Sequence, residues 1–273
     1  MRILVTGGAG KVATSLRSRL VGEGRVLRLF DVVRPTEIEG AGAEEVVLGS
    51  IADPDAVAAA CAGVDAIVHL GGQSKEADAG EELRVNCLGT YHLLETARRR
   101  GITRLMLASS SHAAGFHIRD DATYPDGLPA DLPPRPDTLY GWSKAAVESL
   151  ASLYADRFGL DVICVRIGLW FPTPPQNRGL ATWLSPDDGA RLVEACLSAP
   201  SPGFRIIWGV SRNTRRWWSL AEGEAIGYFP KDDAEVYAAQ RIAEFGEPDF
   251  ANDPELNRVG GWWCDWPLAQ RMG

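Results

Sequence analysis

The sequence predicts an α/β fold in which a doubly wound parallel sheet carries helices on both faces. Three observations lead to this prediction: apolar runs of strand length alternate with helical patterns, the runs are apolar throughout, and polar or glycine-rich loops follow them. Strands buried on both faces have this composition. Because ligands of such sheets bind beyond the carboxyl ends of the strands, these loops are the expected place of function.

The first fifty residues contain three expected strands. A glycine loop at 7–10 follows the first apolar run, and apolar residues then recur at helical spacing over 12–20. Asp31 ends the second run, and Asp53 is the expected cap of the helix after the third. The expected strands are residues 2–6, 25–30 and 46–48.

The same unit repeats in the next sixty residues. Gly71 and Gly72 follow the fourth apolar run, and a long helical pattern through Leu83 and Leu94 closes at Gly101. The fifth run breaks into four polar residues at 109–112. These runs predict strands at 65–70 and 104–108.

The rest of the chain continues the pattern and ends in an irregular tail. Residues 120–137 are rich in Pro, Asp and Gly, which is typical of a long loop at an active site. Helical periodicity returns at 139–158, and a further helix is expected at 186–197. The last two expected strands are 161–166 and 204–208. Most of the tryptophans lie in the tail, the residues after 208.

Composition excludes several classes of protein. The chain has 273 residues, of which 45% are hydrophobic and 23% charged, as in globular rather than disordered proteins. A net charge of −8 disfavours non-specific nucleic-acid binding. Without a bilayer-length apolar run or a signal-peptide cleavage site, we expect a soluble cytoplasmic protein and no membrane partner. Five scattered cysteines without a C-x-x-C pair argue against a disulfide framework and a zinc cluster, and we predict no metal.

The first loop predicts a dinucleotide site in a Rossmann-type domain. The motif Gly7-x-x-Gly10-x-x-Ala13 lies between an expected strand and helix, where glycines let the backbone approach a pyrophosphate. Asp31 follows about 20 residues later, the usual spacing of the acid that binds the adenosine ribose. A carboxylate there repels a 2′-phosphate, so NAD is predicted. Lys11 and the neighbouring Arg34 leave NADP as an alternative.

The start of the 139–158 helix predicts catalysis. Tyr140 and Lys144 form an i, i+4 pair and share one helix face. Such pairs are often ordinary surface, but a phenol with a pKa of ~10 acts as a base at neutral pH when positive charge lies beside it. Lys144 and an oxidised nicotinamide ring both supply such charge. Ser110, at the end of the fifth strand, is placed to bind the same substrate oxygen.

These features together resemble the extended short-chain dehydrogenases/reductases. The marks of that superfamily are a T-G-x-x-G-x-x-A start, Asp31, Asn86, a strand-end serine and Y-x-x-x-K. The chain resembles the uronate dehydrogenase family more closely and over nearly its whole length, in residues 69–74, 108–112, 135–141, 165–168, 182–188 and 217–218. The resemblance implies oxidation of C1 of glucuronate or galacturonate to a lactone, with NAD as cofactor.

The resemblance also implies roles for individual residues. Tyr140 is the general base, Lys144 lowers its pKa, and Ser110 orients the substrate oxygen. The implied cofactor site comprises Gly7, Gly10, Lys11, Val12, Asp31, Ile51, Leu70, Gly71, Tyr140 and Lys144. The implied substrate site comprises Ser74, Ser110, Ser111, His112, Tyr140 and Arg178, with Arg178 holding the anion. This organisation divides the chain into a cofactor-binding and catalytic part, 1–170, and a smaller substrate-binding region, 171–273, packed on it as one compact unit.

The chain departs from the family pattern near the sugar. Ser111 stands where the family has Asn, Leu169 where it has Ser, and Trp170 and Phe171 replace smaller residues. Loss of polar partners and added apolar bulk would alter a pocket that recognises hydroxyl groups. Lys75 adds a cation that suits a sulfonate or phosphate. A sulfonated or otherwise altered sugar is therefore an alternative substrate.

Two other functions stay open. A nucleotide-sugar epimerase or dehydratase needs a diphosphate site, for which the tail offers only Arg212, Arg215 and Arg216 as a basic cluster. A catalytically silent NAD-sensing module would not need the Ser110, Tyr140 and Lys144 set. His69 is interpreted as a packed strand histidine rather than a ligand. A homo-oligomer is compatible with each of these functions.

Overall fold

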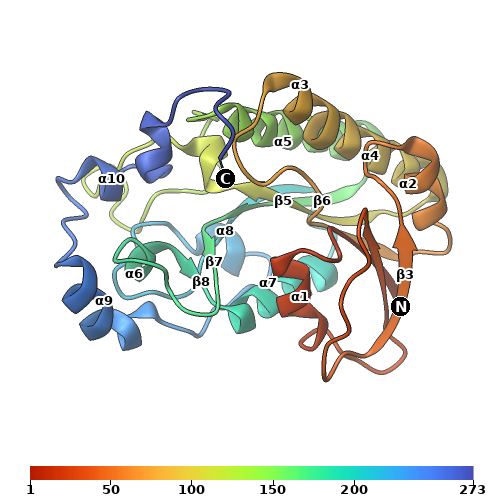
Figure 1. Ribbon diagram of the computed structural model, residues 1–273, viewed down its shortest axis with the longest axis horizontal. Coiled ribbons are helices and arrows are strands. Elements are labelled where there is room, and N and C mark those ends of the chain that lie inside the picture. Colours follow the sequence, from red (N-terminus) through yellow and green to blue (C-terminus); the bar gives the residue numbers. More distant parts are fainter. Residues whose placement is uncertain (273) are drawn as a thin grey trace.

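The structure, a computed structural model, describes residues 1–272. Its centre is a seven-stranded sheet in the order β3-β2-β1-β4-β5-β6-β9 (Figure 1). The strands are β1 (Arg2–Thr6), β2 (Val26–Asp31), β3 (Ala43–Leu48), β4 (Ala66–His69), β5 (Arg104–Ser110), β6 (Asp161–Ile167) and β9 (Phe204–Gly209). Each neighbouring pair is parallel, which confirms the predicted doubly wound α/β fold.

The sheet winds outward in both directions from β1. The chain passes from β1 through β2 to β3, returns to β4 on the other side of β1, and continues through β5 and β6 to β9. The direction of winding reverses between β1 and β4, and ligands of such sheets bind at this switch point. Thr6 is paired with His69, so the loops after β1 and β4 begin at the same level.

Alternate side chains of the strands fill two cores. On β1, Ile3 and Val5 pack in one core with α1 and α7, whereas Leu4 packs in the other with α2, α4 and α5. Figure 1 shows these two helical layers on opposite sides of the sheet. The helices are α1 (Lys11–Arg17), α2 (Pro54–Ala60), α4 (Gly89–Arg100), α5 (Leu139–Phe158) and α7 (Pro186–Ser198). Burial on both faces explains the continuous apolar runs of the central strands β1 and β4, whereas the edge strand β3 is partly exposed and carries two glutamates.

A third apolar cluster joins the tail to the loop that precedes α5. Trp208 and Trp218 stack in it with ring centroids 4.4 Å apart, and Leu128 of the loop belongs to the same cluster. The surrounding elements are short: β7 (Leu169–Trp170), β8 (Trp183–Leu184), α6 (Gly179–Thr182), α8 (Ala221–Glu224), α9 (Ala238–Phe245), α10 (Pro254–Asn257) and the 3₁₀ helices Ser111–Ala114, Ala234–Tyr237 and Gly261–Asp265. Such short elements depend on tertiary contacts rather than on periodicity, and the sequence did not predict them.

The helix after β4 differs from the regular one expected. Helix α3 (Ala79–Glu82) continues into a π-helical segment, Leu83–Leu88, before α4 begins. In this segment Asn86 donates from Nδ2 to the Gln73 carbonyl (3.0 Å) and accepts at Oδ1 from the Gln73 N–H (2.8 Å). Single π-turns inside α-helices often lie at functional sites, and here the turn carries a buried amide to the loop after β4.

Residues beyond position 170 contribute to the sheet itself. Strand β9 pairs with β6, and Leu192 of α7 belongs to the same core as Ile3 of β1. The predicted division at 170 therefore cuts across the sheet. The first helix also ends at Arg17 rather than near Leu20. Within residues 1–272, no helix combines the length and apolarity needed to cross a membrane.

Candidate active site

The loop between β1 and α1 lies against the neighbouring strands so closely that side chains have no room. Gly7 has a φ of 68°, and a Cβ there would lie 2.9 Å from the Gly71 nitrogen. A Cβ at Gly8 would lie 2.8 Å from Cβ of Leu29. The left-handed φ at Gly7 also favours glycine on its own account. The bare backbone of this loop fits the close approach of a pyrophosphate.

Asp31 ends β2 beside this loop. Its Oδ2 accepts from the Ala9 N–H at 2.9 Å, and its Oδ1 accepts from the Val33 N–H at 3.3 Å. A carboxylate offers about four acceptor positions, so lone pairs remain for ribose hydroxyls. The structure places the side chain of Lys11 in solvent and that of Val12 partly inside. This arrangement fits the adenosine half of NAD.

The end of β4 completes the predicted cofactor side. The Gly71 N–H donates to Oγ1 of Thr6 (2.9 Å), which also contacts Nδ1 of His69 (2.7 Å). Nε2 of His69 contacts Oγ1 of Thr90 (3.0 Å), and burial lowers the pKa of His69 to about 3. His69 is therefore a neutral, packed histidine, as predicted. Leu70 is half-buried, and Ile51 is buried against Gly89.

Tyr140 lies in the first turn of α5 and is buried. Thr138 caps this helix, its Oγ1 accepting from the Gly141 N–H at 3.0 Å. Burial raises the pKa of Tyr140 to about 12, and hydrogen bonding to Ser110 opposes that rise. Ser110 is the last residue of β5 and is also buried. The predicted phenol and serine hydroxyl therefore meet at the carboxyl edge of the sheet.

Lys144 lies one turn further along the same helix face. Its ammonium donates to the Ala108 carbonyl at 2.9 Å and lies 5.6 Å from the centroid of the Tyr140 ring. Burial lowers the pKa of Lys144 to about 8, and the carboxylate of Glu82 opposes the change. The structure thus brings Ser110, Tyr140 and Lys144 together, and both titratable groups are strongly desolvated.

Glu82 is a buried carboxyl group that the sequence did not single out. Its Oε2 accepts from Nδ2 of Asn86 (2.7 Å) and from Oγ of Ser143 (3.1 Å). Burial raises the pKa of Glu82 to about 7. The π-helical turn places this group next to α5, so its negative charge acts on Lys144. Only the three-dimensional packing reveals the arrangement.

His112 is held by a buried aspartate. Its Nδ1 lies 2.7 Å from Oδ2 of Asp137, whose side chain is fully buried and also accepts from Oγ1 of Thr138 (3.0 Å). A carboxylate at Nδ1 fixes the proton there and leaves Nε2 for a ligand. The His112 ring lies edge-on to Tyr140, with centroids 5.9 Å apart. The predicted sugar-contacting histidine is therefore beside the predicted base.

Trp263 belongs to the same cluster and was missed in the sequence. Its ring stacks on His112 with centroids 3.9 Å apart and lies 5.8 Å from the Tyr140 ring. It comes from the tail, more than a hundred residues from either partner in the sequence. The concentration of tryptophans in the tail was the only signal, and it did not show which ring reaches the site.

Arg178 fastens the tail beside this cluster. Its Nη1 donates to the carbonyls of Glu255 and Arg258, both at 3.1 Å, and its Nη2 to that of Val259 at 2.5 Å. Burial lowers its pKa to about 10, so the guanidinium stays charged at neutral pH. Three of its five N–H groups are thus committed to backbone carbonyls. Among residues 1–272 the structure gives no hydrogen-bond partner to the remaining N–H groups, at Nε and Nη2.

The remaining predicted substrate residues differ in exposure. Ser111 is buried and begins a 3₁₀ turn, whereas Ser74 is exposed in the loop after β4. Trp170, expected to add bulk to the sugar pocket, is buried in the core with Ala190 of α7. Its ring lies against Gly189 of the same helix. Leu169 is half-buried and Phe171 is exposed.

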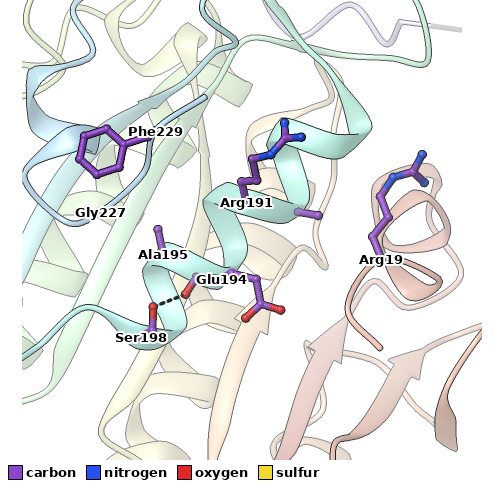
Figure 2. Close-up of a pocket in the computed structure, with 8 residues that line it drawn as sticks. Arg19, Arg191, Glu194, Ala195, Ser198, Gly227 and Phe229 are labelled. Atoms are coloured by element: carbon purple, nitrogen blue, oxygen red, sulfur yellow. Dashed lines mark hydrogen bonds between the residues drawn. The ribbon is translucent and has the colours of Figure 1, made fainter. Parts of the chain in front are cut away.

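Two surface cavities lie outside the predicted sites. The first, of about 400 Å³, is shown in Figure 2 and is lined by Arg19, Ala190, Arg191, Glu194, Ala195, Ser198, Gly227 and Phe229. The second, of about 590 Å³, has Arg119, Arg212 and Arg216 in its lining together with Trp217 and Trp218. Within residues 1–272 no group of three or more His, Cys, Asp or Glu side chains is arranged to hold a metal ion.

Comparison with known proteins extends over the whole chain. Residues 3–185 match the NAD dependent epimerase/dehydratase family. A uronate dehydrogenase of Pseudomonas putida is 40% identical over 260 residues, 95% of this chain and 94% of that protein. One of Agrobacterium fabrum is 40% identical over 270 residues, 99% of each. The solved structure of a uronate dehydrogenase mutant of Agrobacterium tumefaciens, complexed with NAD, has a TM-score of 0.88 at 39% identity and covers 99% of each chain.

Proposed function

Because the chain belongs to the NAD dependent epimerase/dehydratase family and, within it, to the uronate dehydrogenases, we propose that it oxidises the anomeric C1 hydroxyl of a hexuronate to the lactone with NAD. The observation that carries the proposal is the convergence of Ser110, Tyr140 and Lys144 at the carboxyl edge of the sheet, where Lys144 lies close to Gly72 of the loop after β4. A nucleotide-sugar enzyme has no comparable support from relatives of matching length.

Tyr140 is the proposed general base. NAD, when bound, accepts the hydride from C1 and brings the positive charge of its oxidised ring. Tyr140 takes the proton of the C1 hydroxyl at its phenolic oxygen, while Ser110 donates a hydrogen bond to the same substrate oxygen. In the protein alone the pKa of Tyr140 is about 12 and that of Lys144 about 8, both because of burial. The lysine charge must therefore be retained for the phenolate to form near neutral pH.

Recognition of the sugar is assigned to the other side of the site. Arg178 holds the carboxylate of the uronate through the two donors that the tail leaves unused. His112, oriented by Asp137, accepts from a sugar hydroxyl at Nε2. Ser74 and Ser111 are proposed as further hydroxyl contacts. A sulfonated or phosphorylated sugar would use the same guanidinium.

The proposal includes a cytoplasmic location and self-association. The five cysteines are unpaired, which suits a reducing compartment. Leu88, Tyr91 and Leu153 are exposed apolar side chains on the π-helical segment, α4 and α5, which pack against one another. Exposed apolar groups on adjoining helices favour association, and size-exclusion chromatography with light scattering tests it.

A substrate panel tests the proposed reaction. The purified protein is incubated with NAD and with glucuronate, galacturonate, glucose, galactose, glucose 6-phosphate, a 6-sulfonated hexose or a nucleotide sugar, and NADH is followed by absorbance. We expect one NADH per hexuronate oxidised and little with the neutral hexoses. Preference for the sulfonated or phosphorylated hexose would show that such a sugar, rather than a hexuronate, is the substrate. Turnover of the nucleotide sugar without net NADH formation would show that the protein is an epimerase or dehydratase.

A further inference from the structure

Glu76 lies in the loop after β4 and is completely buried. Its Oε2 accepts from the Tyr140 N–H at 2.8 Å, and its Oε1 accepts from the Leu139 N–H at 3.3 Å. These two N–H groups open α5, where the first turn of a helix leaves its donors without intrahelical acceptors. One carboxylate therefore fixes the backbone of the residue that carries the phenol.

The same carboxylate holds a segment from the far end of the sequence. Oε1 also accepts from the Ala269 N–H at 2.9 Å, a contact between residues 193 positions apart. The Glu76 carbonyl accepts from the Met272 N–H at 3.2 Å. Figure 1 shows this blue segment returning to the middle of the molecule, close to the start of α5. Ala269 has a φ of 59°, an unfavourable conformation for alanine that persists only where other contacts fix it.

The segment tied to Glu76 carries the aromatic wall of the site. Trp263 stacks on His112 and lies beside the Tyr140 ring. Arg178 holds the chain on the other side of Trp263, through carbonyls at 255–259. Trp263 is thus fixed from both directions, by the proposed anion-binding arginine before it and by Glu76 after it.

We propose that Glu76 is a positioning residue that couples the first turn of α5 to residues 261–272. This coupling keeps the phenol of Tyr140 and the ring of Trp263 in a fixed position relative to each other. The inference rests on the proposed function. It follows from the chemistry of the contacts, since a carboxyl group can accept at both oxygens and here receives three N–H donors from two separate segments. Misplacement of a reacting group by about 1 Å can cost about 10²-fold in rate.

The test is the isosteric change Glu76→Gln. The amide keeps one oxygen acceptor and turns its NH₂ group toward N–H donors, so either the bond from the Tyr140 N–H or the bonds from the Leu139 and Ala269 N–H groups are lost. We expect kcat to fall about tenfold or more while KM for NAD stays within about threefold. With C1-deuterated uronate, the isotope effect on kcat should rise, because misaligned chemistry becomes rate-limiting. A smaller folded fraction would lower kcat without changing the isotope effect.

Glu81→Gln is the matched control. It makes the same chemical change five residues away, at a carboxylate that pairs with the side chain of Arg271 on the surface. It therefore removes an exposed ion pair to the same segment, a contact that contributes little, and leaves the three N–H groups on Glu76 in place. Its kcat, its isotope effect and its hydrogen exchange at 139–141 should equal those of the wild type. In Glu76→Gln, exchange at 139–141 and 268–272 should be faster. Wild-type kcat and isotope effect in Glu76→Gln despite faster exchange would overturn the inference and leave Glu76 only a stabilising role.

Ala269→Pro is the second variant. Proline lacks the N–H and cannot adopt a positive φ, so the attachment to the tail is lost while the bonds from Glu76 to α5 remain. We expect a higher KM for the sugar and a changed Trp263 environment in tryptophan fluorescence. Wild-type values for both would overturn the coupling even if Glu76→Gln does not fold. If the wild type oxidises no sugar in the panel, the proposed function fails, and hydrogen exchange still decides whether Glu76 holds the two segments.

Discussion

The proposed cofactor side and the proposed substrate side of the site are built in different ways. On the cofactor side, the glycine loop, Asp31 and Gly71 lie at the ends of strands that are hydrogen-bonded neighbours in the sheet, and they contact residues at the ends of those strands. On the substrate side, His112, Arg178 and Trp263 come from three distant segments. Single side chains, Asp137, Arg178 and Glu76, hold these segments together.

This difference has a functional consequence. The sheet fixes the cofactor side through many backbone hydrogen bonds, so one substitution there should alter one contact. On the substrate side one side chain supports several others, and its loss should spread to contacts it does not itself make. The predictions below test this contrast at the point where the two sides meet and then on each side separately.

The largest effect is expected for Tyr140→Phe, at the junction of the two sides. The proton acceptor is lost while the glycine loop and Asp31 are untouched, so turnover should fall by about 10²–10⁴-fold with NAD affinity within a few-fold of the wild type. Steady-state kinetics and a fluorescence titration with NAD measure the two quantities. More than a tenth of wild-type activity would remove Tyr140 from the mechanism.

On the substrate side, Arg178→Ala should reduce kcat/KM for the anionic sugar by tens to about a thousandfold, because the anion loses its charged partner. The bonds from Arg178 to the tail are lost too, so neutral sugars should also be oxidised more slowly, though by less. Arg178→Lys should recover part of the loss, since it keeps the charge without the paired donors.

Arg258→Ala provides the control for this prediction. It removes a guanidinium from the same segment, where the side chain pairs with Asp265, and leaves its backbone carbonyl free to accept from Arg178. Its kinetics should stay close to those of the wild type. If Arg178→Ala oxidises the anionic sugar as efficiently as the wild type, the anion is bound elsewhere and Lys75 becomes the next candidate.

On the cofactor side, Asp31→Ala should narrow the preference for NAD over NADP by about 10–100-fold, the value of hydrogen bonds to a charged group. Asp31→Asn keeps an acceptor for the Ala9 N–H but loses the charge. It therefore distinguishes the role of Asp31 in holding the glycine loop from its role in binding the ribose. Activity with saturating cofactor should change little in either variant. Equal efficiency of the wild type with both cofactors would show that Lys11 or Arg34 overrides the carboxylate.

The smallest effect is a change in pH dependence in Glu82→Gln. The pKa of Glu82 is raised to about 7, so the wild-type group is neutral below that pH and charged above it. Its charge supports that of Lys144, whose pKa is lowered to about 8. The kcat of the variant should therefore equal that of the wild type at acid pH. Above pH about 7 the kcat of the variant should be about two- to fivefold lower. A constant ratio across the pH range would exclude Glu82 from the electrostatics of the base.

Much of the cofactor side could be predicted from the sequence. The glycine motif and Asp31 are close in sequence. Strand and helix periodicity placed both at the carboxyl edge of the expected sheet. The Tyr140 and Lys144 pair was also accessible, since helical spacing alone puts both on one face. The π-helical turn, and with it the buried Glu82, was not accessible, because the apolar periodicity of a π-turn hardly differs from that of the α-helix around it. Asn86 was singled out only through the family resemblance.

By itself the sequence predicted the seven strands of the main sheet, its long helices, the glycine loop and the pairing of Tyr140 with Lys144, because each depends on neighbours within a few turns or strands. Only the tertiary structure decided that Trp170 fills the core, that Trp263 covers His112, and that Glu76 holds the start of α5 together with Ala269. These contacts join segments up to 193 residues apart. No local pattern encodes which of several tryptophans or glutamates reaches a given place, since that depends on how the whole chain packs.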